Sequence, residues 1–100
     1  MLNYTNKYIA ILQARAAAGK EVIPGNILGV YDDEKTALAE FFALGTKAVD
    51  MVRRQSGNIS DNFIFSHLYL YAPAGKGAYL PTAQTEIVKI DFVFKNGEIV

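Results

Sequence analysis

Residues 62–72, NFIFSHLYLYA, decide the fold class of this chain. Successive side chains of a β-strand point to opposite faces of a sheet, so this stretch divides into two sets. The first set is mainly aromatic and consists of Phe63, Phe65, His67, Tyr69 and Tyr71. The second set consists of Ile64, Ser66, Leu68 and Leu70. Both faces of the predicted strand are largely apolar, so both need a covering element or a partner.

A helix is predicted upstream of this strand, beginning at Asp32-Asp33. Asp is a preferred N-cap residue, and Asp33 with Glu34 places negative charge at the positive end of the helix dipole. Apolar or small side chains then recur at three- and four-residue steps, at Leu38, Phe41, Phe42, Gly45, Ala48, Val49 and Val52. This spacing draws one apolar stripe, and Gly57 is a suitable stop. Gly45 on the stripe indicates either a close approach by another backbone or a kink.

A second strand is predicted at residues 86–95, where apolar and charged side chains alternate. Its apolar side carries Val88, Ile90, Phe92 and Phe94, and its charged side carries Lys89, Asp91 and Lys95. A strand of this kind has one face in the core and one in water, so we expect the apolar side to lie under the helix. Asn96-Gly97 then predicts a type I′ turn, followed by a short return strand at residues 98–100.

The first third of the chain is compatible with two interpretations. Residues 26–31 have the pattern of a short strand that leads into the helix cap. Residues 7–18 fit either a helix or a strand that pairs with residues 27–31 across a connection, rich in glycine and containing a proline, at residues 19–25. We favour the strand, because β-forming residues are dense at positions 8–12 and because residues 27–31 need a partner.

Together these elements predict a single α+β domain over residues 1–100. The predicted architecture is an antiparallel sheet of about four strands with one long helix packed on one face, in the order β-β-α-β-β. The alternative order is α-β-α-β-β, in which residues 7–18 are helical. One helix covers only one side of a sheet, so a largely apolar face is left over. That face must meet the N-terminal segment, a second subunit or a ligand.

The composition is that of a folded domain with balanced charge. Hydrophobic residues make up 51% of the chain, and ten basic residues balance ten acidic ones. These values exclude intrinsic disorder and a globally basic nucleic-acid binder, so we expect no nucleic-acid partner. The chain has no cysteine and one histidine. We therefore expect no disulfide, no zinc–thiolate or multi-histidine metal site, and no cofactor.

Signals for export or membrane insertion are missing from the sequence. The first seven residues lack the charged region and the long apolar core of a secretory signal. No apolar run approaches the roughly 18 residues that a membrane-spanning helix needs. We therefore expect a cytoplasmic protein that has no membrane partner.

His67 is the residue to which a general acid–base role would fall, because histidine ordinarily changes charge near neutral pH. Ser66 is no nucleophile partner for it, since neighbours along a strand point to opposite faces. Asp91 or Lys89 can pair with His67 only if the two strands are adjacent in the right register. A histidine flanked by aromatic residues on a strand is more often packed or interfacial than catalytic, so we assign no catalytic residue.

The leading functional hypothesis is a small non-enzymatic protein–protein interaction module. We expect it to form a homodimer, or to serve as an accessory or inhibitory factor for a larger partner. The candidate interface residues are Phe63, Phe65, His67, Tyr69 and Tyr71. The alternative is a binder of a small planar ligand or nucleotide, which would use the same aromatic face and the loop of residues 73–85. The candidate loop residues are Gly75, Lys76, Gly77 and Tyr79.

Overall fold

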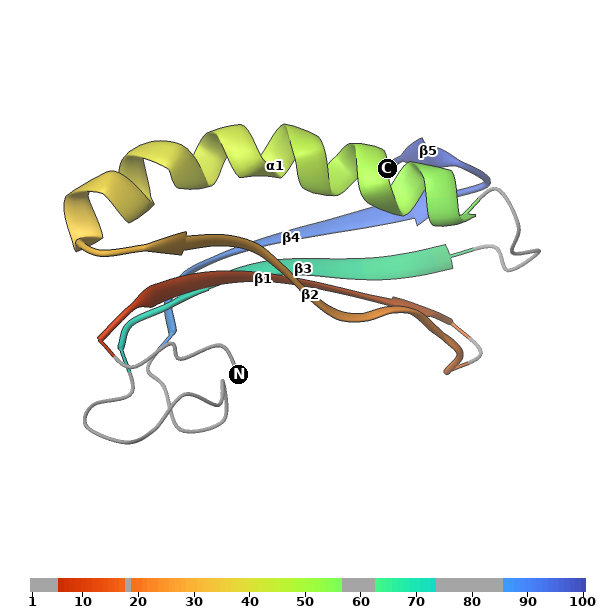
Figure 1. The fold of residues 1–100 in the computed structure, drawn as a ribbon. Coiled ribbons are helices and arrows are strands. Elements are labelled where there is room, and N and C mark those ends of the chain that lie inside the picture. Colours follow the sequence, from red (N-terminus) through yellow and green to blue (C-terminus); the bar gives the residue numbers. More distant parts are fainter. Residues whose placement is uncertain (1–5, 18, 57–62, 74–85) are drawn as a thin grey trace.

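The computed structural model describes residues 6–17, 19–56, 63–73 and 86–100. Its elements are, in chain order, β1 (Tyr8–Ala16), β2 (Glu21–Tyr31), α1 (Glu34–Ser56), β3 (Phe63–Tyr71), β4 (Glu86–Lys95) and β5 (Glu98–Ile99). The strands make one sheet in the order β2-β1-β3-β4-β5, and every neighbouring pair is antiparallel. The helix lies across one face of this sheet (Figure 1). The predicted α+β architecture is confirmed, with the short return strand β5 as a fifth strand.

Residues 7–18 contain a strand rather than a helix. β1 occupies the middle of the sheet, between β2 and β3. Its consecutive side chains from Ile9 to Leu12 all have exposed fractions of 7% or less. Such continuous burial suits a strand in the middle of a sheet, with a neighbour on each side, and its apolar residues therefore do not alternate with polar ones. The order β-β-α-β-β is therefore the correct one.

β2 is longer than predicted, and the expected start at Asn26 is wrong. The strand begins at Glu21, so Pro24 and Gly25 lie inside it rather than in a connection. β2 is an edge strand, where a proline costs no ladder hydrogen bond if its nitrogen faces outward. The pairing with β1 adapts through register shifts, and Gln13 Nε2 donates a hydrogen bond to the Pro24 carbonyl oxygen at 3.4 Å.

The N-terminus of α1 is capped as predicted. The backbone N–H of Thr36 donates to Asp33 Oδ1 at 2.8 Å, and the Thr36 hydroxyl donates to Asp33 Oδ2 at 3.0 Å. These bonds lower the pKa of the Asp33 carboxyl, the backbone bond most strongly. Asp32 instead forms an ion pair with Lys7, just before β1. Helix capping thus accounts for one of the two aspartates, and a contact between chain segments accounts for the other.

Gly45 does not serve the close backbone approach that its place in the apolar stripe indicated. The helix runs without interruption from Glu34 to Ser56. A Cβ atom added at Gly45 would lie 3.9 Å from Ile90 Cδ1, which is ordinary van der Waals contact. The glycine is therefore not required for a close approach by another backbone.

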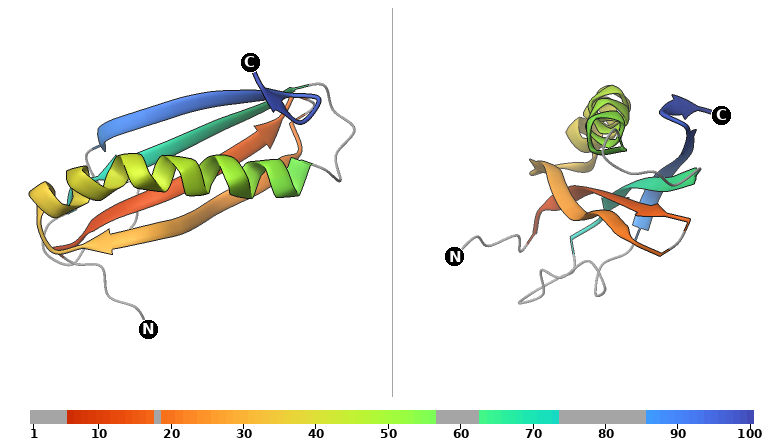
Figure 2. Two further views of the ribbon diagram at one scale, coloured as in Figure 1. Left: turned by 90° about the horizontal axis from the view of Figure 1, so that it is seen from above. Right: turned by 90° about the vertical axis from the view of Figure 1, so that its right-hand side faces the viewer.

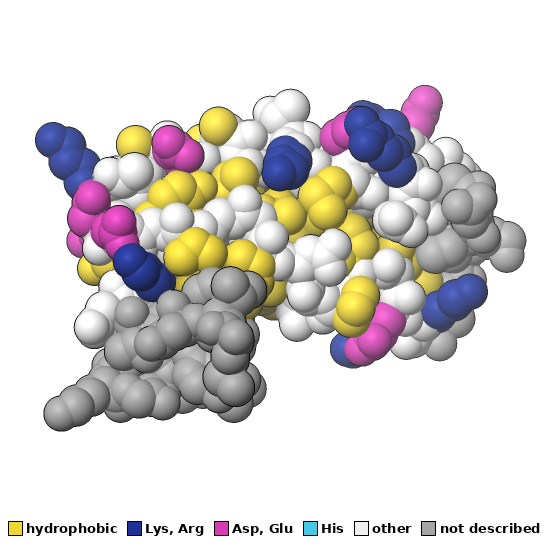
Figure 3. All heavy atoms as spheres, in the orientation of Figure 1, with side chains coloured by type: hydrophobic (Ala, Val, Ile, Leu, Met, Phe, Trp, Pro, Cys, Tyr) yellow, Lys and Arg dark blue, Asp and Glu magenta, His cyan; other side chains and the backbone are white. Residues whose placement is uncertain are grey.

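The hydrophobic core lies between α1 and the sheet face that carries Ile64 and Leu68. Phe41 and Val52 of α1 and Phe94 of β4 are almost fully buried in it. On the face of the molecule shown in Figure 3, hydrophobic side chains form a band beneath the helix, and the charged side chains lie mainly around this band. The apolar side of β4 faces the side of the sheet that carries α1, as predicted, but the helix packs mainly on β2, β1 and β3, and of the apolar side of β4 only Phe94 is buried.

The predicted apolar stripe of the helix is too broad. Phe42 is 70% exposed and Leu38 is 37% exposed, so neither belongs to the core. The buried helix residues with apolar side chains are Ala37, Phe41, Ala48 and Val52. These positions form a narrower stripe, because a helix that lies on a sheet touches it along a narrow line of side chains.

The turn between β4 and β5 has the predicted type I′ geometry. Asn96 and Gly97 have φ values of 53° and 84°, and this turn type needs positive φ at both central residues. Beyond the turn, the Val100 N–H donates to the Val93 carbonyl oxygen at 3.0 Å. β5 therefore pairs only with the C-terminal end of β4.

Candidate functional site

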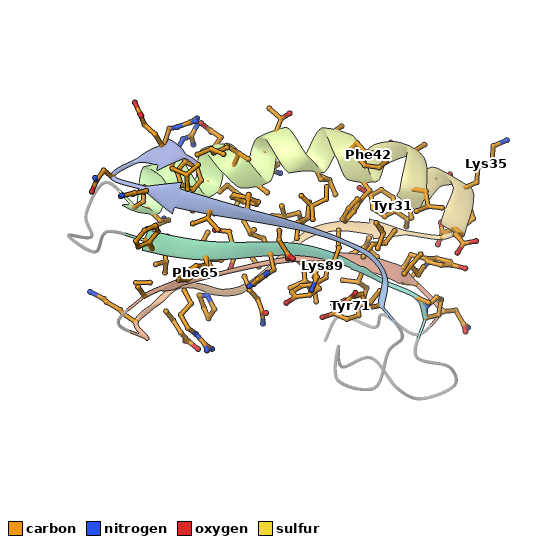
Figure 4. The ribbon with its side chains drawn as sticks, turned by 180° about the vertical axis from the view of Figure 1, so that it is seen from behind. Tyr31, Lys35, Phe42, Phe65, Tyr71 and Lys89 are labelled. Atoms are coloured by element: carbon orange, nitrogen blue, oxygen red, sulfur yellow. The ribbon has the colours of Figure 1, made fainter. Side chains whose placement is uncertain are left out.

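The sheet face opposite α1 is covered by no helix within the part of the chain that the structure describes. We call it the open face. Its residues are Ile9, Ile11, Gln13 and Arg15 of β1, Glu21, Ile27 and Val30 of β2, Phe63, Phe65, His67, Tyr69 and Tyr71 of β3, and Lys89, Asp91, Val93 and Lys95 of β4. Figure 4 shows Phe65, Tyr71 and Lys89 pointing away from the helix, while Phe42 and Tyr31 lie on its side of the sheet. All five predicted interface residues are therefore on the open face.

The aromatic side chains of β3 form a row along the open face. Phe63 and Phe65 stack with their ring centroids 6.2 Å apart and an interplanar angle of 13°. Tyr69 stands 5.8 Å from the His67 ring and 5.5 Å from the Tyr71 ring. Phe65 is 44% exposed, and its four companions in the row are half-buried. The row therefore presents ring surface to whatever lies on the open face.

His67 pairs directly with Asp91 across β3 and β4, which is the register that the sequence left undetermined. The distance between His67 Nδ1 and Asp91 Oδ1 is 2.6 Å, and Lys89 Nζ lies 3.7 Å from Asp91 Oδ2. The hydrogen bond with His67 holds the pKa of the Asp91 carboxyl below its usual value, and Lys89 adds to this effect while partial burial opposes it. The imidazole is thus anchored through one ring nitrogen, which fixes the ring orientation within the row.

A groove of about 370 Å³ lies on the open face beside this row. Its lining includes Gln13, Arg15, Glu21 and Pro24 from β1 and β2, together with Phe65, His67 and Tyr69 from β3. Arg15 lies directly opposite Phe65 on one side and Glu21 on the other. The groove therefore combines a guanidinium, a carboxylate, an imidazole and aromatic rings, which suits contact with a mixed polar and aromatic surface.

The part of the groove that β1 and β2 provide was not predicted from the sequence. Glu21 lies in the predicted connection of residues 19–25, whereas in the structure it belongs to β2 and pairs with Arg15. Val22 and Ile23 are β-branched and favour a strand, but Pro24 and Gly25 directly after them favour a turn. Ser66 and His67 point to opposite faces of the sheet, as predicted. Ser66 is buried on the core side, and His67 lies on the open face.

The predicted loop site lies outside the described residues. Its candidates are Gly75, Lys76, Gly77 and Tyr79. Within the described ranges, no group of three or more His, Cys, Asp or Glu side chains is placed to hold a metal ion. In the same ranges, no helix has both the length and the apolar character needed to cross a membrane.

No protein-family model, curated protein or solved structure matches this chain. The functional interpretation therefore depends on the geometry of the open face. Two features of that face carry it, the aromatic row and the groove beside it.

Proposed function

We propose that this protein is a non-enzymatic protein–protein interaction module that associates with a second copy of itself through the open face. The observation that carries the proposal is the row of half-exposed aromatic side chains on the sheet face opposite α1. Each large apolar side chain left in water forgoes roughly 1.5–3 kcal/mol of available burial. Ile27 and Val30 of β2, which pair with Ile11 and Ile9, extend this exposed apolar surface. A contiguous surface of this kind is typical of an interface.

The side-chain chemistry of the open face supports a protein partner. Aromatic residues and arginine are enriched in the centres of protein interfaces, and tyrosine offers an apolar ring with a hydroxyl for the rim. The charged residues of the face have both signs: Arg15, Lys89 and Lys95 against Glu21 and Asp91. A nucleic acid requires a large excess of positive charge, and the net charge of these five side chains is only about +1. Charges of both signs on one patch suit a two-fold contact, in which the same patch meets itself.

Replacing Phe65 by Asp tests this proposal, because Phe65 is exposed enough to change without disturbing the core. We expect the variant to keep its folded far-UV signal and to form an assembly of half the wild-type mass in light scattering. Leu38→Asp on α1 is the matched control, since it places the same charge at an exposed apolar site on the other side of the molecule. Equal masses for wild type and a folded Phe65→Asp variant would overturn the proposal.

A second candidate function is the binding of a small planar ligand in the groove. The observation in its favour is the placement of Phe65, His67 and Tyr69 along a groove of about 370 Å³. A ligand bound only by the native state raises stability by about 2.7 kcal/mol at one hundred times its dissociation constant. A thermal-shift screen with nucleotides and aromatic metabolites therefore tests it. Saturable stabilisation that Tyr69→Ala abolishes would support this function, and its absence across the screen would count against it.

A further inference from the structure

The outer edge of β4 is open along most of its length. β5 pairs with Phe94 and Lys95 only, and Val100 bonds to Val93. From Glu86 to Phe92, no strand within the described residues pairs with β4 on the side away from β3. Figure 2 (left) shows β4 running along one margin of the sheet, outside the strip that α1 crosses. An open edge of this length is a template for another strand.

The β-turn identifies which backbone groups of β4 point outward. In a two-residue hairpin the flanking residues, here Lys95 and Glu98, form a hydrogen-bonded pair. Val93 also uses its carbonyl oxygen toward Val100. Outward bonding alternates along a strand, so the N–H and C=O groups of Lys89 and Asp91 point away from β3 as well. These two residues offer the central donors and acceptors of the open edge.

The opposite edge of the sheet is much less suited to pairing. β2 contains Pro24 and Gly25, and its pairing with β1 has register shifts at three places. Irregularity and proline are devices that protect an edge from another strand. β4 has neither between Val88 and Lys95, where its pairing with β3 is regular. The sheet therefore has one protected edge and one regular, open edge.

We propose that β4 pairs in antiparallel fashion with β4 of a second copy, in a register centred on Ile90. On the open-face side, Lys89 then lies opposite the partner's Asp91, and Asp91 lies opposite the partner's Lys89. On the helix side, Ile90 meets the partner's Ile90, and Val88 meets the partner's Phe92. Opposite charges and apolar pairs across strands are stabilising, and each Lys89–Asp91 pair also exchanges two backbone hydrogen bonds.

Charge and side-chain alternation exclude the neighbouring registers. A register centred on Lys89 places that lysine opposite the partner's Lys89, and one centred on Asp91 places two carboxylates together. Like charges directly opposite destabilise a strand pair. A register centred between two residues places open-face side chains against helix-side ones, which the alternation of a strand does not allow. Only the register centred on Ile90 is self-complementary, and for this reason the occupant we propose is a second copy of this chain.

The helix side of β4 also needs a cover. Val88, Ile90 and Phe92 are half-buried, whereas the helix-side residues of β3 are buried. A groove of about 780 Å³ runs between α1 and β4, and Phe42 and Val49 are among its lining residues. The two-fold axis of an antiparallel β4 pair runs perpendicular to the sheet, so the second copy places its own helix and groove on the same side. Pairing therefore brings apolar side chains of both copies together where α1 leaves β4 half-covered.

Single-cysteine cross-linking tests the register, since the natural chain has no cysteine. Ile90→Cys places two thiols at a non-hydrogen-bonded pair, where Cα atoms are about 4.5 Å apart and a disulfide can form. We expect rapid and nearly complete cross-linking with diamide. Val88→Cys and Phe92→Cys are the matched controls, because each is about 13 Å from its own copy in this register. Neither control cross-links alone, whereas an equal mixture of the two does.

Cross-linking of Ile90→Cys reports on the β4 edge and not on the open face, because the Ile90 side chain points to the helix side of the sheet. The cross-linking is therefore repeated in the Phe65→Asp background. If Ile90→Cys cross-links there as well, the edge pairing holds whatever the fate of the open-face contact. No cross-linking of Ile90→Cys, or equal cross-linking of all three single variants, would overturn the register.

Charge reversal gives a second and independent test in the Phe65→Asp background. Lys89→Asp and Asp91→Lys each place like charges opposite each other twice, so we expect self-association at least about tenfold weaker. Mixing these two variants restores opposite charges at both positions, and we expect the mixture to pair again. Lys95→Asp is the control, since Lys95 faces β5 outside the seam. A mixture that stays dissociated would show that the two charges do not meet.

Discussion

Replacing Phe41 by Ala is expected to lower the free energy of unfolding by about 3–5 kcal/mol. Phe41 is 0% exposed and lies in the core between α1 and the sheet. This loss is the sum of two contributions. The first is the transfer free energy of the aromatic ring, and the second is the free-energy cost of the cavity that remains because the surrounding strands relax only in part. The better helix propensity of alanine offsets less than about 0.7 kcal/mol of this loss. Domains of this kind have about 5–15 kcal/mol in total, so the variant is close to unfolding.

Phe42→Ala is the matched control for that measurement. Phe42 is the next residue of the same helix, and its ring stands edge-to-face with Phe41 at 6.0 Å. It is 70% exposed, so we expect its truncation to change the free energy of unfolding by less than about 1 kcal/mol. Both variants are measured by urea denaturation with the slope m compared between them. A loss below about 1 kcal/mol for Phe41→Ala, or equal losses for both variants, would refute the assignment of the core.

Three further substitutions have defined outcomes. Gly45→Ala is expected to raise the free energy of unfolding by about 1 kcal/mol, because alanine has the higher helix propensity and the added Cβ meets Ile90 at ordinary contact distance. A lower free energy of unfolding in urea denaturation would show that the added Cβ is crowded. Ser66→Ala is expected to be neutral or stabilising, since Ser66 Oγ is buried without a hydrogen-bond partner among the described residues; a loss above about 1 kcal/mol would point to an unseen partner. His67→Gln is expected to flatten the acid dependence of stability. The hydrogen bond with His67 lowers the pKa of Asp91 in the folded state, so its contribution is present above about pH 4 and is lost as the pH falls through the folded pKa. Urea midpoints of wild type and variant between pH 2 and 5 would show the same slope if this reasoning failed.

The elements that the sequence predicted well are those defined by local interactions. The helix start depends on the contact of Asp33 with Thr36, three residues away. The turn at Asn96-Gly97 depends on the positive φ that these two residue types accept. Alternation along residues 63–71 places the aromatic row on one face whatever the sheet order. In each case the physical cause lies within a few residues, so a single sequence contains it.

The start of β2 and the exposure of Phe42 could not be predicted in the same way. Pro24 and Gly25 are acceptable within β2 because the strand lies at the edge, and that position depends on the order of all five strands. Phe42 fits the apolar periodicity of α1, but its position relative to the sheet depends on the direction in which the helix crosses the strands. Both features are consequences of packing between distant segments, which local sequence patterns do not determine.

In the candidate site, too, the features set by local alternation were predicted and those set by strand order were not. The aromatic row was predicted residue by residue, whereas its neighbours were not. The contact of His67 with Asp91 needs β3 beside β4 in one particular register, and the groove needs Arg15 beside Glu21 across β1 and β2. A sequence pattern assigns side chains to faces, and only the strand order determines which faces of different strands meet.

The open face and the β4 edge impose different symmetries, and the two are compatible. The two-fold axis of the β4 pair is perpendicular to the sheet, so both copies keep their open faces on the same side and form one wide surface. A two-fold contact between open faces has its axis in the plane of the sheet. Two perpendicular two-fold axes close an assembly of four chains. We therefore expect wild type to have the mass of four 11.0 kDa chains at high concentration. Phe65→Asp is expected to leave the pair joined by β4. A wild-type protein that never exceeds two chains would show that one of the two contacts does not form, and the Ile90→Cys cross-link identifies which.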